Sequence, residues 1–346
     1  MYKMFILPVL SALSQGDAEK AHRLAIWGMR RLQKSPGILK LVAEWSGADG
    51  APRPTTVWGI TFPNRIGLAA GFDKHAEVIP FLQALGFGFL ELGTVLPRPQ
   101  RGDDRPRVFR LAKHKAIINR MGFNSDGAEV VEKRLAKVRP KIKIPIGISV
   151  GKMKETPNEK AAKDYGMAAA ILHAYGDYLA ANASSPNTPE LRKLLTKEFL
   201  APFVHSVVLG EASRALSFKQ KVRPVLIKVS PLPDSTEKEG EETIATCVEE
   251  GASGIIIGNT TLGRPVPPSK KASESGGFSG PQTFKNTVKF LQMVRRRYPL
   301  FPVIAVGGVN SAERMRVLLG EGANLVQVYT GFIYEGPGLI RELRVI

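Results

Sequence analysis

Short apolar runs and longer amphipathic stretches alternate along most of the chain. Continuous apolar runs predict strands that are buried on both faces, and apolar side chains recurring every three or four positions predict helices. The predicted strands are residues 66–70, 89–94, 145–150, 178–182, 224–229, 254–258, 302–306 and 325–329. The predicted helices between them include residues 76–85, 126–138, 159–174, 191–203, 284–297 and 311–319.

This alternation predicts an α/β fold in which eight βα units close into a (β/α)8 TIM barrel. An open, doubly wound sheet is the alternative, but no GxGxxG fingerprint follows the first predicted strand. Two segments interrupt the alternation. Residues 95–111 are predicted to form a hairpin, and residues 263–281 a long loop of the kind that covers a site.

The first 45 residues have a different pattern. An amphipathic helix is predicted after Asp17, followed by a shorter one that ends near Trp45, and the segment contains seven basic and three acidic residues. Such a hairpin could pack against its own domain or lie in the interface of an anionic membrane. Residues 46–56 have the composition of a linker. We therefore expect an extension at 1–45, a linker at 46–56 and a barrel domain at 57–346.

Composition limits the possible partners. The chain carries 49 Lys and Arg against 31 Asp and Glu, a net charge of +18, which favours anionic partners. The basic residues are dispersed and no nucleic-acid motif is present, so we expect a phosphate ligand or a membrane surface and no nucleic acid. The single cysteine, Cys247, argues against disulfides, and the five histidines lack metal-binding spacing, so no metal is expected. No apolar run reaches the ~20 residues of a spanning helix. Residues 1–13 are interrupted by Pro8 and are not interpreted as a signal peptide.

Small and polar residues follow the predicted strands. The fullest set is Asn-Ala-Ser-Ser-Pro-Asn-Thr at 182–188, which alone would be an ordinary turn. Similar residues occur at 69–74, 93–94, 149–152, 258–261, 307–308 and 329–331. Because the carboxyl ends of barrel strands meet on one face, these segments predict a ligand site, with glycines after the last two strands available to a phosphate. Lys228, inside a strand, needs an anionic partner.

Eight segments together resemble the membrane-associated, quinone-reducing class (class 2) of dihydroorotate dehydrogenases. They are residues 67–74, 91–94, 105–110, 118–124, 182–192, 276–280, 306–308 and 325–330. Residues 17–24 also resemble the extension of that class. The soluble class lacks this extension and uses a cysteine as its base, where this chain has Ser185.

The resemblance implies an FMN enzyme of pyrimidine biosynthesis that oxidises (S)-dihydroorotate to orotate and reduces a membrane quinone. Ser185 would remove the C5 proton while hydride passes from C6 to the flavin N5. A positioned base is worth about 10²–10⁴ in rate, although a serine hydroxyl is a poor base. A relay through Thr188 and Phe123, under a closed loop, would assist it.

The resemblance also implies the ligand-binding residues. The substrate would be held by Lys74, Asn119, Arg120, Met121, Gly122, Phe123, Asn182, Asn187, Asn259 and Thr260. FMN would be held by Ala69, Ala70, Gly71, Thr94, Ser149, Asn182, Lys228, Gly258, Gly280, Gly308, Tyr329 and Thr330. Lys228 would lie beside the flavin N1/O2 edge. The quinone tunnel would include His22, Arg110 and Tyr329.

Three positions depart from the usual pattern of that class. Ser149 stands where relatives usually have asparagine, Gly258 where threonine or alanine is usual, and Glu190 replaces a small residue. None removes the base, Lys74, Lys228 or the phosphate-binding glycines, so we expect an active enzyme.

We further expect a monomeric peripheral protein on the cytoplasmic face of a bacterial inner membrane, attached through residues 1–45. Three alternatives remain open from the sequence. One is a flavin dehydrogenase that uses fumarate or NAD, and another is a Schiff-base aldolase with Lys228 as nucleophile. The third is a non-catalytic barrel that its helical hairpin tethers to membranes.

Overall fold

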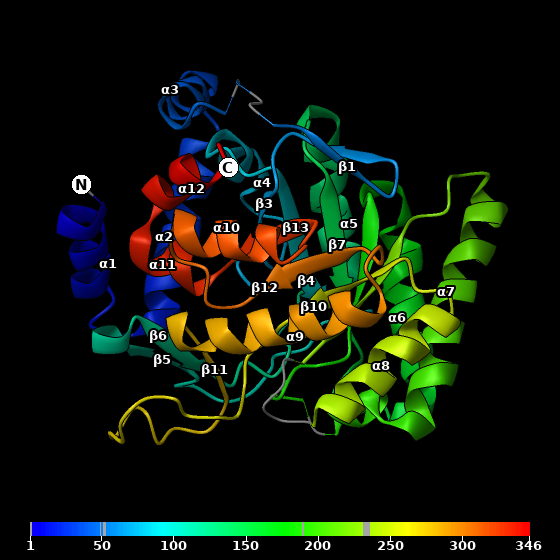
Figure 1. The fold of residues 1–346 in the computed structure, drawn as a ribbon. Helices are drawn as coiled ribbons and strands as arrows, with labels where there is room; N and C mark the ends of the chain where they lie inside the picture. Colours follow the sequence, from blue (N-terminus) through cyan, green and yellow to red (C-terminus); the bar gives the residue numbers. More distant parts are fainter. Residues whose placement is uncertain (1, 49, 51–52, 189, 231–235) are drawn as a thin grey trace.

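The structure is a computed structural model that describes residues 2–48, 50, 53–188, 190–230 and 236–346. Eight parallel strands close into a barrel in which β13 pairs with β3 (Figure 1). They are β3 (Ile66–Leu68), β4 (Phe89–Val95), β7 (Ile146–Val150), β8 (Tyr178–Asn182), β9 (Val225–Val229), β10 (Gly254–Ile257), β12 (Val303–Val306) and β13 (Leu325–Val328). The predicted TIM barrel is confirmed, and each predicted strand is found within two residues of its expected ends.

Helices surround the barrel and cover the outward apolar faces of the strands. They are α4 (Ile79–Ala84), α5 (Ala128–Val138), α6 (Ala161–Ile171), α7 (Lys197–Phe218), α8 (Glu237–Glu249), α9 (Phe284–Arg297), α10 (Ala312–Gly320), α11 (Thr330–Glu335) and α12 (Pro337–Leu343). The helix predicted at 191–203 is wrong at both ends. Residues Leu191–Leu195 form a 3₁₀ turn, and the extended backbone of Thr196 separates this turn from α7.

One end of the barrel is closed. The hairpin of β1 (Thr55–Val57) and β2 (Ile60–Phe62) lies under it, and Phe62, Phe89 and Tyr178 fill the interior there with Leu226. The opposite end, where the strands terminate, is therefore the end that remains available for a ligand.

The N-terminal segment packs against the barrel as short helices (Figure 1). A π-helical turn (Tyr2–Ile6) leads into α1 (Leu7–Leu13), α2 (Ala18–Leu32) and α3 (Pro36–Ser46). Asp17 caps α2 as predicted, accepting a hydrogen bond from the Lys20 amide at 2.9 Å. Within the described part of the chain, no helix combines the length and apolarity needed to cross a bilayer. Residues 49, 51 and 52 of the expected linker lie outside the described residues.

A small antiparallel sheet lies beside the open end of the barrel. It contains β5 (Val108–Leu111), β6 (Ala116–Asn119) and β11 (Gly277–Ser279). The hairpin predicted at 95–111 is therefore wrong, because β4 runs on to Val95 and the two strands of the hairpin are β5 and β6. The predicted loop 263–281 also contains β11, which pairs with β6 and brings the end of that loop next to Asn119.

Candidate functional site

One cavity of about 1010 Å³ opens at the carboxyl ends of the barrel strands and extends to α1 and α2. Its wall contains most of the residues that the sequence singled out. From the barrel these are Ala69, Ala70, Gly71, Lys74, Thr94, Asn119, Met121, Gly122, Phe123, Asn182, Ser185, Asn187, Lys228, Gly258, Asn259, Thr260, Gly280, Gly308, Tyr329 and Thr330. His22 of α2 and Arg110 of β5 lie on the same wall. A single space thus connects the strand ends with the N-terminal helices.

Amide and hydroxyl groups form a network at the ends of β4, β7 and β8. Asn182 donates to Thr94 Oγ1 at 2.8 Å, and Thr94 Oγ1 lies 3.1 Å from Ser149 Oγ. The Asn259 amide donates to Asn182 Oδ1 at 3.3 Å and to Ser184 Oγ at 2.8 Å. Ser149 is fully buried behind Thr94, away from the cavity wall. The serine at this position therefore supports Thr94 rather than reaching the cavity itself.

Ser185 lies in the loop that follows β8. Its side chain is nearly buried, and Oγ accepts a hydrogen bond from the Asn187 amide at 3.3 Å. The Asn187 side chain donates to Asn119 Oδ1 at 3.1 Å, which joins this loop to β6. Thr188 is buried off the cavity wall, and its Oγ1 has no hydrogen-bond partner among the described residues. Glu190, farther along the loop, has a left-handed backbone (φ 56°), a conformation that suits a glycine better.

Lys74 follows β3 and extends into the cavity. Its Nζ donates to Asn124 Oδ1 at 2.5 Å. Burial, together with a smaller effect of the nearby Arg107, lowers the pKa of Lys74 to about 7. The ammonium group is therefore close to its titration point near neutral pH, and an anionic ligand would stabilise its charged form. Asn124 belongs to the segment 118–124, but sequence reasoning gave it no role.

Lys228 has the anionic partner that its position in a strand requires. Nζ donates to Glu91 Oε1 at 3.0 Å, and Glu91 is almost completely buried inside the barrel. Glu91 also accepts hydrogen bonds from Gln327 at 2.8 Å and from Tyr178 at 3.4 Å. This ion pair engages the amine that a Schiff base would need, which disfavours the aldolase alternative. Sequence reasoning missed Glu91 and Gln327, although a charged or amide residue inside an apolar strand was a usable signal.

Glycines at the ends of β10 and β12 bring the backbone close to the cavity. A Cβ on Gly308 (φ 73°) would lie 2.6 Å from the Phe284 amide nitrogen, and one on Gly258 (φ 105°) would overlap the Val306 carbonyl. The backbone at position 258 therefore requires glycine, because any side chain there would clash with the Val306 carbonyl. Arg314, which sequence reasoning missed, donates to the carbonyls of Gly308 and Pro281 at 2.7 and 2.8 Å and joins their loops.

Hydroxyl groups complete this part of the wall. Thr330 Oγ1 donates to Ser279 Oγ at 2.8 Å, directly after the end of β13. Gly280 lies next to Ser279, and a Cβ there would lie 2.8 Å from the Ala116 Cβ. Cavity-lining backbone and hydroxyl groups at three chain segments make a suitable surface for a phosphate group.

Aromatic rings pack together in the part of the cavity near α2. The His22 ring packs edge-on against Phe72 at 5.0 Å between centroids, and burial lowers the pKa of His22 to about 4. Tyr329 donates to the Gly71 carbonyl at 3.4 Å, and burial raises its pKa to about 12. Both side chains are therefore uncharged at neutral pH, beside the cationic Arg110.

The Arg120 side chain does not reach the cavity wall, in contrast to its expected place in the substrate site. It pairs with Glu274 at 2.8 Å, donates to the Pro106 carbonyl at 2.9 Å and lies over the Phe109 ring at 4.6 Å. Arg120 directly follows the end of β6, and these contacts hold its side chain away from the site.

Comparisons with known proteins agree with this geometry. The sequence profile of the dihydroorotate dehydrogenase family matches residues 54–344. The chain is 43% identical over 328 residues to a dihydroorotate dehydrogenase (quinone) of Acidithiobacillus ferrooxidans, covering 94% of this chain and 90% of that protein. It is 39% identical to one of Chloroflexus aurantiacus, covering 99% and 94%. The structure of DHODH from Eimeria tenella in complex with ferulenol superposes with a TM-score of 0.84 at 32% identity, covering 98% of this chain and 93% of that one.

Proposed function

The chain belongs to the dihydroorotate dehydrogenase family, and from this premise we propose that it oxidises dihydroorotate to orotate and reduces a quinone. The relatives named dihydroorotate dehydrogenase (quinone) match it over nearly their whole length. The observation that carries the proposal is the single cavity that contains Ser185 and Lys74 and extends to α1 and α2. One space can hold both substrates and the group that passes electrons between them.

FMN fits the residues of this cavity. The phosphate would bind the backbone around Gly280, Gly308 and Thr330, and the ring would lie on residues 69–71 beside Thr94 and Lys228. Gln327 Oε1 is a buried acceptor without a protein partner among the described residues, as expected where a ligand completes the site. Bound there, FMN would supply the two-electron chemistry that couples the oxidation of one substrate to the reduction of the other.

The residues around Ser185 would orient dihydroorotate and remove its proton. The ammonium group of Lys74 would bind the carboxylate. Asn119, Asn182, Asn187 and Asn259 offer amides, which can match both N–H and carbonyl groups of a pyrimidine ring. Oxidation removes a proton from C5, which Ser185 Oγ would accept. The buried Thr188 hydroxyl would relay it, and Phe123 would exclude water.

The N-terminal helices would contact the membrane and admit the quinone. Large apolar side chains are exposed on this segment: Met4, Ile6, Val9, Leu13, Trp27, Leu32, Leu41 and Trp45. Basic residues on the same helices, among them Arg23, Arg30 and Lys40, suit an anionic lipid surface. The quinone would pass between these helices to His22, Arg110 and Tyr329. We thus propose a monomeric, peripheral membrane enzyme of pyrimidine biosynthesis on the cytoplasmic face of a bacterial inner membrane.

Electron-acceptor specificity tests this proposal. With dihydroorotate as donor, the purified holoenzyme should reduce a short-chain ubiquinone analogue, and fumarate or NAD should support less than about a tenth of that rate, a difference of about 1.4 kcal/mol in barrier. The absorbance of orotate gives the rate of its formation with each acceptor. Orotate formed faster with fumarate or NAD than with quinone would contradict the quinone assignment.

A further inference from the structure

Helix α2 places one carboxylate, that of Glu19, in the wall of the cavity. We propose that Glu19 is a positioning residue for substrate binding, because it neutralises Arg107 and so maintains Lys74 as the cation that binds the substrate carboxylate. The N-terminal extension would then contribute to the dihydroorotate site as well as to the quinone site. This inference rests on the proposed function, through the role of Lys74.

Glu19 forms a dense ion-pair cluster with two arginines. Arg107 donates to its carboxylate through Nε at 2.9 Å and through Nη2 at 2.8 Å, and Arg105 donates through Nε at 3.2 Å and Nη2 at 2.9 Å. Burial raises the pKa of Glu19, but the arginine hydrogen bonds outweigh this effect and hold it at about 2. Glu19 is therefore fully ionised at neutral pH.

Arg107 depends on this carboxylate. Its side chain is only 4% exposed, and its remaining hydrogen bonds go to the backbone carbonyls of Arg101 and Asp103. Glu19 is the acidic side chain that pairs with it in the described part of the chain. Without Glu19 the Arg107 charge would be buried and uncompensated.

A short path of contacts links Arg107 to Lys74. A Cβ placed on Gly102 would lie 2.9 Å from Arg107 Nη1 and 3.0 Å from the Asn124 Cβ, so both side chains lie against Gly102. Asn124 in turn accepts the hydrogen bond from Lys74 Nζ at 2.5 Å. Among the described residues, Lys74 has no carboxylate of its own within ion-pair distance. It therefore responds to the balance between Arg107 and Glu19.

The sign of the effect follows from the surrounding charges. After burial, Arg107 is the main influence that lowers the pKa of Lys74, and Glu19 opposes it. Other titratable groups near Lys74 include His22 and His75, whose pKa values are lowered by burial, and the adjacent Asp73, whose pKa is raised by burial to about 6. Lys74 is charged below its pKa of about 7, so dihydroorotate affinity should fall as pH rises through that value. Neutralising Glu19 should lower this pKa and move the loss of affinity to lower pH.

The substitution Glu19→Gln in the full-length holoenzyme tests this inference. Anaerobic bleaching of the flavin by dihydroorotate, measured across neutral pH, gives a half-saturating concentration and a limiting rate. At neutral pH the half-saturating concentration should rise roughly tenfold for each pH unit by which the affinity loss is displaced, with the limiting rate within about twofold of the original. Glu19→Asp, which keeps the charge, should recover much of the affinity. Glu44→Gln, on the exposed surface of α3, is the matched control and should change neither value.

A double variant makes the test independent of folding. In the variant that combines Glu19→Gln with Arg107→Gln, both charges are absent. Affinity for dihydroorotate should then be lost at a pH no lower than in the original protein. Affinity lost at lower pH in the double variant would overturn the inference. So would a Glu19→Gln protein with an unchanged pH profile, or one with only a reduced limiting rate. Failure of dihydroorotate to bleach the unaltered protein would instead refute the proposed function.

Discussion

Ser185, the proposed base, lies in a loop that other residues hold in place. Its Oγ accepts from the Asn187 amide, and Asn187 is fixed by Asn119 on β6. In the proposed mechanism, the site would supply orientation and water exclusion to a hydroxyl with little basicity of its own. The Ser185 hydroxyl hydrogen-bonds within its own loop and not to the glycine segments around residues 280 and 308. Its role can therefore be tested separately from binding of the cofactor phosphate.

The substitution Ser185→Ala should leave flavin bound and slow its reduction by dihydroorotate by about 10²–10⁴-fold, the contribution of a positioned base. Stopped-flow absorbance under anaerobic conditions measures this rate. Ser217→Ala, in an exposed position on α7, serves as the control. A near-normal rate in the Ser185 variant would assign the base elsewhere.

Individual residues also show where sequence reasoning stops. The need of Lys228 for an anion could be predicted from its place in an apolar strand. That the anion is Glu91 could not, because the two are 137 positions apart and meet only when the barrel closes. Arg120 was expected in the substrate site because the segment 118–124 resembles the family, but contacts with Glu274 and Phe109 hold its side chain away from the cavity wall.

At the scale of elements, hydrophobic periodicity predicted the eight strands and most of the helices. It failed where pairing between distant segments decides the structure. The strand β11 exists because β6 is beside it, and its sequence has the polar, glycine-rich character of a loop. Helix α7 continues to Phe218, and its amphipathic pattern is weak because α6 and α8 both pack against it.

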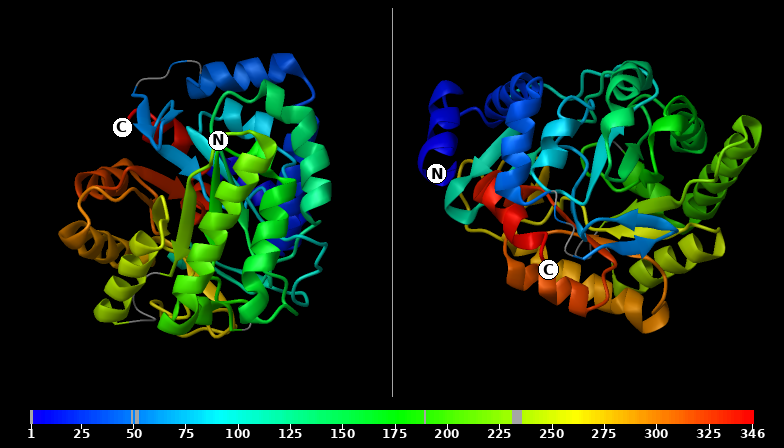
Figure 2. Two further views of the ribbon diagram at one scale, coloured as in Figure 1. Left: turned by 90° about the vertical axis from the view of Figure 1, so that its right-hand side faces the viewer. Right: turned by 90° about the horizontal axis from the view of Figure 1, so that it is seen from above.

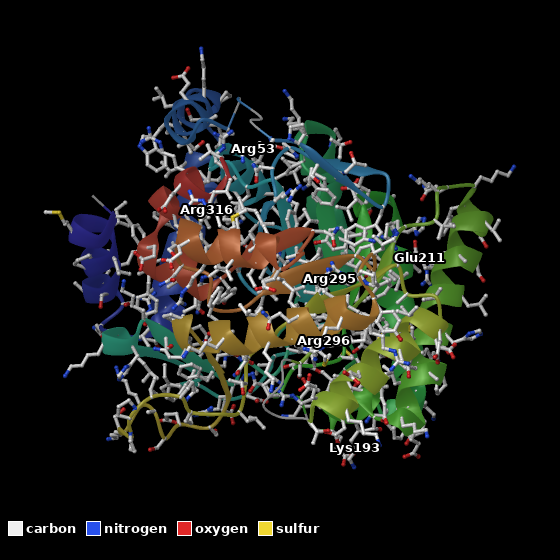
Figure 3. All side chains as sticks on the ribbon, in the orientation of Figure 1. Arg53, Lys193, Glu211, Arg295, Arg296 and Arg316 are labelled. Carbon is white, nitrogen blue, oxygen red and sulfur yellow. The ribbon has the colours of Figure 1, made fainter. Side chains whose placement is uncertain are left out.

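A buried ion-pair cluster joins α7 to the segment before β9. Glu211 of α7, labelled in Figure 3, is completely buried and accepts two hydrogen bonds from Arg223 at 2.8 Å each. Nδ1 of the buried His173 lies 3.2 Å from the same carboxylate. An ion pair of this kind is costly to break on one side, since the remaining charge stays buried.

The substitution Glu211→Ala should therefore lower the free energy of unfolding by about 3–5 kcal/mol. Urea denaturation of the holoenzyme, followed by circular dichroism, measures the change. Glu250→Ala removes a more exposed ion pair with His205 and should cost no more than about 1 kcal/mol. Equal losses of unfolding free energy in the two variants would refute the claim that burial makes the Glu211 ion pair costly to break.

At the scale of the whole molecule, the N-terminal helices and α7 lie at opposite edges of the barrel (Figures 1 and 2). Both edges expose apolar side chains, for example Leu41 and Trp45 on α3 and Leu216 and Phe218 on α7. Of these two edges, in the described part of the chain, the N-terminal one borders the cavity, through α1 and α2. We therefore propose that the membrane contact lies on the edge formed by the N-terminal helices.

This assignment predicts that replacing Leu41 and Trp45 by serine weakens binding to anionic phospholipid vesicles roughly tenfold or more, given the apolar area removed. Flavin reduction by dihydroorotate should remain unchanged, because neither side chain borders the cavity. Sedimentation with vesicles measures the binding. Replacement of Leu216 and Phe218 by serine is the matched control. A larger loss of vesicle binding in this control would place the membrane contact on the α7 edge and contradict the proposal.

The central claim is that one cavity couples dihydroorotate oxidation to quinone reduction, and an anaerobic absorbance spectrum of the purified holoenzyme tests it most directly. We expect a yellow protein that bleaches when L-dihydroorotate is added and recovers its colour when a ubiquinone analogue follows. A flavin that dihydroorotate leaves oxidised, or a protein that stays colourless after FMN is supplied, would contradict it.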